Sequence, residues 1–328
     1  MKKNIAIVAG GYSSELEVSL KSVETVFQHL PEEKYHKFVV IVNSQGWNVR
    51  VNEALFPINK NDFSFEMDGK THFFDCVYLT IHGTPGEDGK LQGYFDMLGI
   101  PYNSCNSKTS ALTFDKWLCN QVLANNGIHV SKSVLINDRS AMFNTKEIVA
   151  ELGLPCFVKP NDGGSSFGIS KVKEEMQLIP AINRAFAEGN EVMIEAFMEG
   201  KEVTCACYKS DKEIIALPLI EIVSENEFFD YEAKYEGKSQ EICPARIPDE
   251  QRDRVQEITK KIYSLLGLKG IIRVDFMLVG NEPFVIEVNT APGMSAASLV
   301  PQMVEKYEHA NLSQVLHTVV QESMKPEY

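Results

Sequence analysis

The sequence predicts a mixed fold of α/β and α+β type whose N-terminal domain contains a parallel sheet. Residues 4–9 form an apolar run that ends at Gly10-Gly11, as a buried strand does before a turn. Apolar side chains then recur at helical spacing between Leu16 and Leu30. Two further apolar stretches read as strands, at 37–42 and 75–81. Strand, helix and strand in this order favour a doubly wound domain, in which ligands bind beyond the carboxyl ends of the strands.

The rest of the chain predicts two α+β units. The second unit is expected to contain a helix at 108–126, a strand at 130–136, a helix at 145–152, a helix at 174–187 and a strand at 192–195. The third is expected to contain strands from 201 to 222, a polar and aromatic loop at 224–247, a helix at 249–266, two strands and a last helix at 312–322. We therefore divide the chain into domains at 1–107, 108–200 and 201–328.

Charge and composition exclude several function classes. The 32 Lys and Arg against 45 Asp and Glu give a net charge of −13, which argues against a nucleic-acid or anionic-membrane binder. No apolar segment approaches the roughly 18 residues of a membrane span. The seven cysteines contain no Cys-x-x-Cys spacing. The cytoplasm is the expected compartment.

A stretch rich in glycine and serine lies between two expected strands, at 159–168, and reads KPNDGGSSFG. Glycines let backbone N–H groups converge on an anion, hydroxyls add donors, and Lys159 adds a positive charge. The pattern predicts a flap over a polyphosphate, with an ordinary hairpin turn as the competing interpretation. It is neither a Walker loop nor a Gly-x-Gly-x-x-Gly fingerprint, and the missing glycines count against a dinucleotide-dependent oxidoreductase.

A hairpin near the C-terminus carries polar residues on one face of apolar strands. Side chains alternate along a strand, so Arg273 and Asp275 share a face, as do Glu287 and Asn289. A turn centred on Asn281 would place Asp275 opposite Glu287 and Arg273 opposite Asn289. Two carboxylates and an amide oxygen suit Mg²⁺ or Mn²⁺ completed by water and phosphates, whereas a solvated sheet face is the competing interpretation.

The glycine stretch and the hairpin together resemble the ATP-grasp superfamily. Over nearly its whole length the chain is similar to the D-alanine–D-alanine ligase family. The matching blocks are AGGYSSELEVSL at 9–20, IHG at 81–83, GEDGKLQG at 86–93, DK at 115–116, the glycine stretch, FDYEAKY at 229–235, RVD at 273–275, EVNTAPGM at 287–294 and SLVP at 298–301. The resemblance implies an ATP-grasp fold, in which the second and third domains sandwich ATP.

The resemblance also implies a reaction. ATP would phosphorylate the carboxylate of one D-alanine, and the amine of a second would attack the acyl phosphate to give the dipeptide, ADP and phosphate, for peptidoglycan precursor synthesis. Phosphoryl transfer requires charge neutralisation and positioning rather than a protein nucleophile. D-alanine and ATP would be the partners, two Mg²⁺ (or Mn²⁺) the metal ions, and a homodimer the assembly.

The family match assigns roles to individual residues. Those implied for catalysis are Glu15, Ser165, Tyr235, Arg273 and Gly293, where Arg273 and the Gly293 N–H would stabilise the oxyanion and Ser165 would link Glu15 to Tyr235. Those implied for the two amino acids are Glu15, His82, Lys234, Ser298 and Leu299. Those implied for ATP are Lys116, Lys159, Ser165, Ser166, Glu195, Ala196, Met198, Glu202 and Lys234. Asp275, Glu287 and Asn289 would hold the metal, and loop 224–247 would close over the site.

Two departures from the family pattern affect these assignments. Ala196 stands where lysine is frequent, so main-chain groups of Ala196 and Met198 would have to read the adenine edge, with Glu202 on the ribose. Thr84-Pro85 also differs from the usual residues beside His82. The alternatives are a D-alanine–D-lactate ligase, another ATP-grasp carboxylate–amine ligase, and a nucleotide sensor that would not need Arg273.

Overall fold

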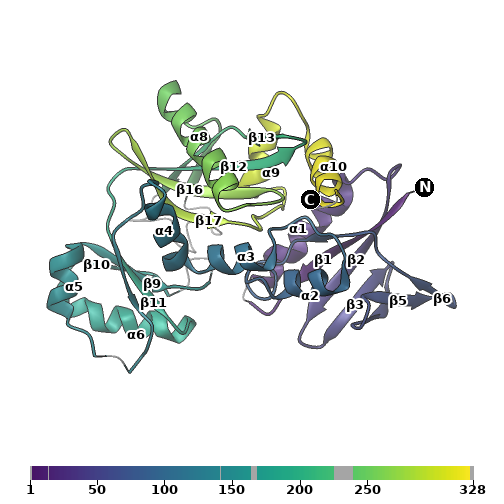
Figure 1. Cartoon of the computed structure of the whole chain (residues 1–328), viewed down its shortest axis with the longest axis horizontal. Helices are drawn as coiled ribbons and strands as arrows, with labels where there is room; N and C mark the ends of the chain where they lie inside the picture. Colours follow the sequence, from purple (N-terminus) through teal and green to yellow (C-terminus); the bar gives the residue numbers. More distant parts are fainter. Residues whose placement is uncertain (1, 14, 141, 164–167, 225–238, 326–328) are drawn as a thin grey trace.

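A computed structural model describes residues 2–13, 15–140, 142–163, 168–224 and 239–325. Its strands form a seven-stranded, a four-stranded and a six-stranded sheet. In Figure 1 the first lies at the right, the second at the left, and the third above and between them. No helix of the described segments is long and apolar enough to cross a membrane.

The first sheet contains the predicted parallel strands and an extension that the sequence did not suggest. β1 (Lys3–Gly10) pairs in parallel with β2 (Tyr35–Asn43) and β7 (Cys76–Leu79), and α1 (Leu16–His29) packs on β1. The sheet then continues beyond β2 with antiparallel strands: β3 (Gly46–Val51), β4 (Ala54–Asn59), β5 (Ser64–Met67) and β6 (Lys70–His72). The loops after β1 and β7 both lie at the carboxyl edge of the parallel strands, where ligands are expected.

The second sheet is antiparallel, in the order β10-β9-β11-β8. Its strands are β8 (Ser133–Ile136), β9 (Cys156–Pro160), β10 (Ser170–Val172) and β11 (Val192–Ala196). The helices of this unit are α5 (Thr145–Leu152) and α6 (Leu178–Glu188), preceded by the 3-10 turn η1 (Glu175–Gln177). Their apolar sides share one core with the sheet. The glycine stretch connects β9 to β10.

The predicted helix at 108–126 is two helices, α3 (Ser107–Phe114) and α4 (Lys116–Asn125). Asp115 leaves helical geometry with ψ at 99° and its carboxylate accepts from the Leu118 N–H, so it ends one helix and caps the next. Cys119 and Leu123 of α4 share a core with the third sheet, and α3 contacts β17. The helix pair therefore packs on the third sheet rather than on the second (Figure 1).

The third sheet has the order β15-β14-β12-β16-β17, with β13 paired to β12. Its strands are β12 (Lys201–Ser210), β13 (Glu213–Ala216), β14 (Ile220–Ser224), β15 (Ser239–Ile242), β16 (Ile272–Val279) and β17 (Glu282–Asn289). Its helices are α8 (Asp249–Leu265), α9 (Leu299–Glu305) and α10 (Leu312–Ser323). One face of this sheet packs on α8 and α4, and Ala206 and Tyr208 on the other join a core shared with α10, α1 and β1. This second face therefore looks toward the N-terminal domain.

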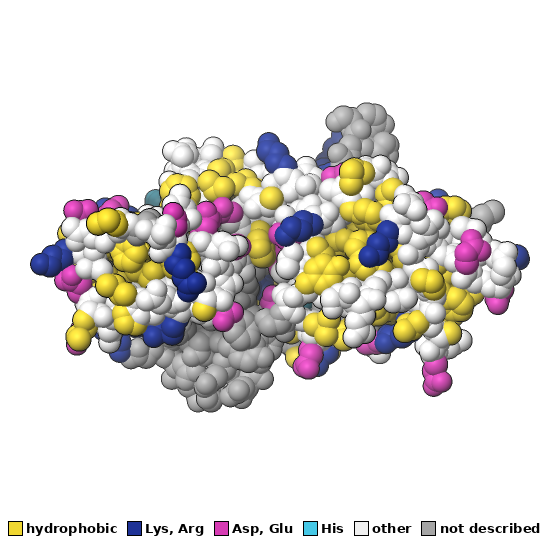
Figure 2. Space-filling model, turned by 90° about the horizontal axis from the view of Figure 1, so that it is seen from below, with side chains coloured by type: hydrophobic (Ala, Val, Ile, Leu, Met, Phe, Trp, Pro, Cys, Tyr) yellow, Lys and Arg dark blue, Asp and Glu magenta, His cyan; other side chains and the backbone are white. Residues whose placement is uncertain are grey.

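The surface is mixed in charge. On the face drawn in Figure 2, Lys and Arg side chains lie singly among acidic, apolar and uncharged groups. The described residues of that face form no continuous basic stripe of the kind that nucleic-acid binding requires.

Candidate active site

The β16–β17 hairpin places the four predicted polar residues together. The register pairs Asp275 with Glu287 and Arg273 with Asn289, as the sequence predicted. The turn, however, is not centred on Asn281 but consists of Gly280 and Asn281. A β-bulge between Asp275 and Phe276 shifts the register by one residue and thereby restores the predicted pairing. This shift keeps both Val285 and Val288 buried while Glu287 and Asn289 share the polar face.

Arg273 and Asp275 form a bidentate pair on this face. Arg273 Nε lies 2.7 Å from Asp275 Oδ1 and Nη2 lies 2.8 Å from Oδ2. Burial disfavours the charged guanidinium and alone would lower the pKa of Arg273. The negative charges of Asp275, Glu287 and Glu87 have the larger effect, so the pKa of Arg273 is raised. Arg273 is therefore a fixed positive charge in a site that is only partly open to solvent.

Asp275 has two further hydrogen-bond donors. Thr204, on β12 directly opposite, donates to Oδ1 at 2.6 Å, and Asn289 Nδ2 donates to Oδ2 at 3.1 Å. Thr204 is only 1% exposed. Sequence reasoning missed it, because the pairing of β12 with β16 is not visible in either strand alone.

The predicted metal ligands have suitable chemistry but are engaged within the protein. Asp275, Glu287 and Asn289 offer hard oxygen atoms, which Mg²⁺ prefers. However, Asn289 Nδ2 also lies 3.4 Å from Glu287 Oε1, so its amide nitrogen points at both carboxylates. In the described ranges no group of three or more His, Cys, Asp or Glu side chains is arranged to hold a metal ion. A cation at the hairpin would compete with Arg273 and Asn289 for these oxygens.

Lys116 connects the glycine stretch to the hairpin. As the first residue of α4 it donates from Nζ to the Gly163 carbonyl, and Nζ lies 3.9 Å from Glu287 Oε2. Asn161, fully buried at the end of β9, receives the Trp117 N–H at 2.8 Å and donates to Asp115 Oδ1 at 2.9 Å. The start of α4 is thus fixed to the flap, and Lys116 is held between flap and carboxylates.

Lys159 and Glu195, both predicted for ATP, form a buried ion pair. Lys159 Nζ lies 2.7 Å from Glu195 Oε1, with side chains 7% and 9% exposed, on neighbouring strands β9 and β11. A buried pair of this kind is sensitive to the loss of one partner, because the remaining charge is left without compensation. Lys159 therefore cannot approach a phosphate without its carboxylate partner nearby.

The main chain of Ala196 is less available than the sequence suggested. Its N–H donates to the Lys132 carbonyl at 2.9 Å and its carbonyl accepts from the Ser131 hydroxyl at 2.7 Å. In this conformation the Ala196 N–H is therefore already hydrogen-bonded, and the reading of the adenine edge by main-chain groups of Ala196 and Met198 stays a prediction. Met198 lies two residues beyond β11 and is half-buried, and Glu202 lies on β12 on the same face as Thr204.

The loops after β1 and β7 bring acidic side chains and a histidine to the hairpin. Ser13 Oγ donates to the His82 carbonyl at 2.9 Å, which ties the two loops together. Burial lowers the pKa of His82. The nearby Glu15 carboxylate acts to raise this pKa, and the Arg273 charge acts to lower it further. In the part of the chain that the structure describes, His82 Nε2 is buried without a hydrogen-bond partner. A polar atom of this kind is expected to face a bound polar ligand or water.

Glu87 belongs to the same group, and sequence reasoning did not single it out. Its Oε2 accepts from the Gly83 N–H at 2.6 Å. Burial and the neighbouring Glu15 carboxylate raise its pKa to about 8. The available signal was its place in the GEDGKLQG block, but only the fold brings it close to Glu15 and Glu287.

Gly293, Ser298 and Leu299 lie where the chain leaves β17 and enters α9. A Cβ added to Gly293 would lie 2.7 Å from Ser298 Oγ, so a side chain at this position would require the Ser298 side chain to move. Ser298 precedes Leu299, the first residue of α9, and its hydroxyl lies 2.7 Å from that of Ser295. The Gly293 backbone is therefore closely packed beside the serine predicted to bind the second carboxylate.

Glu241 is a further acidic residue facing Arg273. It lies on β15, burial raises its pKa, and Arg273 opposes that rise. Gln302 Nε2 donates to it at 2.5 Å and thereby connects β15 to α9. The remaining predicted residues, Ser165, Ser166, Lys234 and Tyr235, lie outside the described residues, as does most of loop 224–247.

Comparison with known proteins supports the predicted family resemblance over nearly the whole chain. The family models "D-ala D-ala ligase N-terminus" and "D-ala D-ala ligase C-terminus" match residues 4–105 and 122–321. A D-alanine–D-alanine ligase of Parabacteroides distasonis is 48% identical over 99% of this chain and 98% of its own length. One of Porphyromonas gingivalis is 47% identical over 99% of both chains.

Solved structures give the same result. The VanG D-Ala:D-Ser ligase of Enterococcus faecalis superposes with a TM-score of 0.87 at 35% identity, covering 98% of this chain and 99% of its own. A D-alanine–D-alanine ligase of Bacillus anthracis complexed with ATP has a TM-score of 0.78 at 28% identity, covering 98% of this chain and 97% of its own. These matches confirm the resemblance and the ATP-grasp fold, and the chain belongs to the D-alanine–D-alanine ligase family.

Proposed function

We propose that this protein joins two D-alanine molecules in an ATP-dependent, ADP-forming reaction that supplies a peptidoglycan precursor. The observation that carries the proposal is the convergence of Glu15, His82 and Arg273 at the hairpin, with a buried His82 Nε2 that awaits a polar partner. Sequence identity of 47–48% to D-alanine–D-alanine ligases over nearly the full length of both chains supports the same reaction.

The first half-reaction requires one D-alanine with its ammonium held and its carboxylate free to react. Glu15 supplies the negative charge for the ammonium, and His82 Nε2 faces the same region. The carboxylate attacks the γ-phosphorus of ATP, and the bond to the β-phosphate oxygen breaks. Lys116 and Lys159 neutralise phosphate charge during the transfer. When bound, Mg²⁺ held by Asp275, Glu287 and Asn289 supplies further neutralisation of the phosphates.

The second half-reaction requires stabilisation of a tetrahedral intermediate. The second D-alanine binds its carboxylate at Ser298, beside Leu299, and its amine attacks the acyl carbon. Negative charge then develops on the carbonyl oxygen, and Arg273 and the Gly293 N–H stabilise it. The amine loses a proton, the intermediate expels phosphate, and the dipeptide forms.

Several roles rest on the family match alone. Ser165 and Ser166 contribute donors to the flap, Lys234 contacts the nucleotide and the second carboxylate, and Tyr235 closes the link from Glu15. Met198 and Glu202 contact the adenosine. We also propose a homodimer and a cytoplasmic location, the latter in accord with seven free cysteines.

An ADP-release assay with product identification tests the proposal. D-alanine should support turnover and give D-alanyl-D-alanine, whereas L-alanine should not. Mixtures of D-alanine with D-lactate or D-serine test the second site, and we expect the dipeptide of D-alanine to predominate at neutral pH. A depsipeptide or a D-serine product in excess would show a different second substrate, and no D-alanine-dependent ADP would refute the proposal.

A further inference from the structure

A basic pocket lies at the end of the N-terminal sheet that is farthest from the candidate active site. It has a volume of about 560 Å³, and it is lined by Lys2, Lys3, Glu33, Lys34, Tyr35, His317, Gln321 and Met324. Lys3 and Tyr35 lie opposite each other at the first pair of β1 and β2, whereas the Glu15 loop follows the other end of β1. Eight residues of strand, at ~3.3 Å each, separate the two ends by roughly 23 Å.

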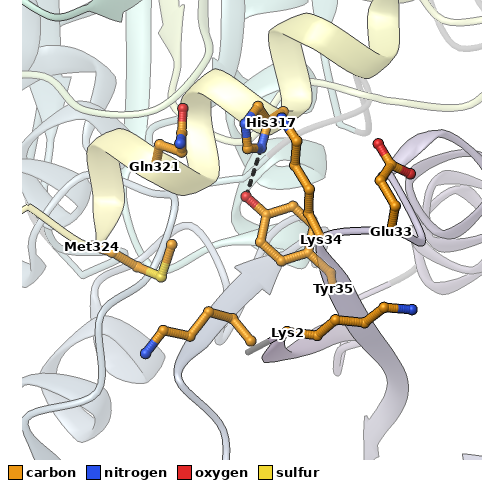
Figure 3. A pocket seen from close by; sticks show the side chains of 8 residues that line it. Lys2, Glu33, Lys34, Tyr35, His317, Gln321 and Met324 are labelled. Carbon is orange, nitrogen blue, oxygen red and sulfur yellow. Dashed lines mark hydrogen bonds between the residues drawn. The ribbon is translucent and has the colours of Figure 1, made fainter.

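The pocket is formed by two domains. Lys2 directly precedes β1, Lys34 directly precedes β2 and Tyr35 begins β2. His317 and Gln321 project from α10 and Met324 directly follows it (Figure 3). The two sides already touch, because Tyr35 Oη lies 2.7 Å from His317 Nδ1 and Lys34 Nζ lies 2.7 Å from His317 Nε2. A ligand in the pocket would therefore contact both domains.

The charges of the lining favour an anion. Three lysines face one acid, Glu33, in a chain whose net charge is −13. Lys3 is paired with Asp75 at 2.8 Å, which leaves Lys34, beside His317 and Tyr35, as the cation best placed for a ligand (Figure 3). Neighbouring ammonium groups repel one another, and a bound anion would offset that repulsion.

His317 is held in the neutral form by its neighbours. Lys34 can only donate, so Nε2 accepts, and Nδ1–H donates to the Tyr35 oxygen. Burial and the Lys34 ammonium lower the pKa of His317, with Glu33 opposing them. The Tyr35 proton is then available to another acceptor, and an anion that drew Lys34 away would free Nε2 to take up a proton.

We propose that this pocket binds a phosphate-bearing small molecule, with the phosphate beside Lys34, Tyr35 and His317. Ammonium groups and a hydroxyl are suitable donors for phosphate oxygens. The volume exceeds the need of a single phosphate ion and falls within the range of small-molecule sites, so the apolar side of Met324 and the Gln321 amide would contact the remainder of the ligand. The bound molecule would join α10 to the N-terminal sheet.

Phosphate binding can be measured with the active site already filled. Calorimetry with inorganic phosphate, in the presence of Mg²⁺ and a saturating non-hydrolysable ATP analogue, should detect one site in the wild-type protein. Lys34→Gln should raise the Kd at least about fivefold, because it removes a charge-assisted hydrogen bond. Lys212→Gln, an equally exposed lysine in the turn between β12 and β13, should leave the Kd unchanged.

A second measurement follows His317 itself. The ring-proton NMR signal of His317, assigned by its loss in His317→Gln, should titrate at higher pH when phosphate is present, as Lys34 moves from Nε2 to the anion. Lys34→Gln should remove this phosphate effect while D-alanine-dependent ADP release stays near the wild-type rate. An equal affinity in Lys34→Gln, or the same NMR shift with NaCl at matched ionic strength, would refute the site without bearing on the ligase reaction.

Discussion

Replacement of Arg273 by alanine tests the assignment of the oxyanion donor most directly. Arg273 makes two of the four hydrogen bonds received by Asp275, so Thr204 and Asn289 remain as partners in the variant. Loss of one oxyanion donor typically lowers kcat by ~10²–10³, equivalent to about 2.7–4 kcal/mol. We expect a loss at the upper end, because the guanidinium also offsets the charge of Glu287.

The same substitution should cost little in folding. Asp275 keeps two donors, so the free energy of unfolding should fall by about 1–3 kcal/mol rather than by the full cost of an uncompensated buried charge. ATP binding, measured by calorimetry, should persist within about threefold, because Arg273 is assigned to the acyl transfer and not to the nucleotide.

Two further variants separate charge, geometry and stability. Arg273→Lys keeps the positive charge but loses the planar guanidinium that binds Asp275 through two hydrogen bonds, so we expect it to recover only part of kcat. Arg246→Ala breaks a bidentate pair with the buried Glu221 and should lower stability, which gives a reference for the loss of a paired arginine. Turnover of Arg273→Ala within about fivefold of wild type, in a folded protein that binds ATP, would remove Arg273 from the chemistry.

Substitutions at Glu87, at Thr204 and in the Lys159–Glu195 pair address neighbouring parts of the site. Glu87 has its folded pKa raised from 4.5 to about 8, so the native state binds more protons than the unfolded state between these values, and stability should fall as pH rises from about 5 to 8. Melting temperatures across this range should show that slope, and Glu87→Gln should flatten it; an unchanged slope would assign it to another group. Thr204→Val should lower kcat about tenfold with little change in KM for ATP, because Asp275 loses one hydrogen-bond donor. Thr204→Ser keeps the hydroxyl and should act as wild type. Equal kcat in both variants would contradict a positioning role for Thr204. Glu195→Gln should destabilise the protein by about 3–5 kcal/mol, since it leaves Lys159 buried without its charge partner. The double variant Lys159→Met/Glu195→Met should unfold at a higher denaturant concentration than Glu195→Gln, although it should bind ATP weakly. If the double variant unfolds at a lower denaturant concentration, the two charges are not coupled.

Patterns within single strands predicted much of this protein. The apolar run at 4–9 and the helical spacing after it located β1 and α1, and the alternation along 270–289 placed Arg273, Asp275, Glu287 and Asn289 on one face. These predictions succeeded because side-chain periodicity records which face of an element is buried. The break at Asp115 was missed because an N-cap inside a helical pattern leaves the periodicity nearly intact.

Pairings between distant segments were beyond the sequence. The antiparallel extension from β3 to β6 went unnoticed, and nothing local indicated that Thr204 would face Asp275 or that Glu195 would neutralise Lys159. Nor could the sequence reveal that Ser131 and Lys132 occupy the main-chain groups of Ala196. Each of these contacts depends on strand order, which is set by how the sheets pack and not by any one strand.

By itself, then, the sequence determined the residue types that the chemistry requires, the order in which they occur, and the family to which they belong. Tertiary structure decided which of them are charged, paired or available. The β-bulge opposite Asp275 brings Glu287 onto the polar face. Burial and the nearby Glu15 carboxylate raise the pKa of Glu87. The contact between α10 and the N-terminal sheet creates the basic pocket. The physical reason is that desolvation and Coulomb interaction depend on distances in space, which residues far apart in the chain acquire only on folding.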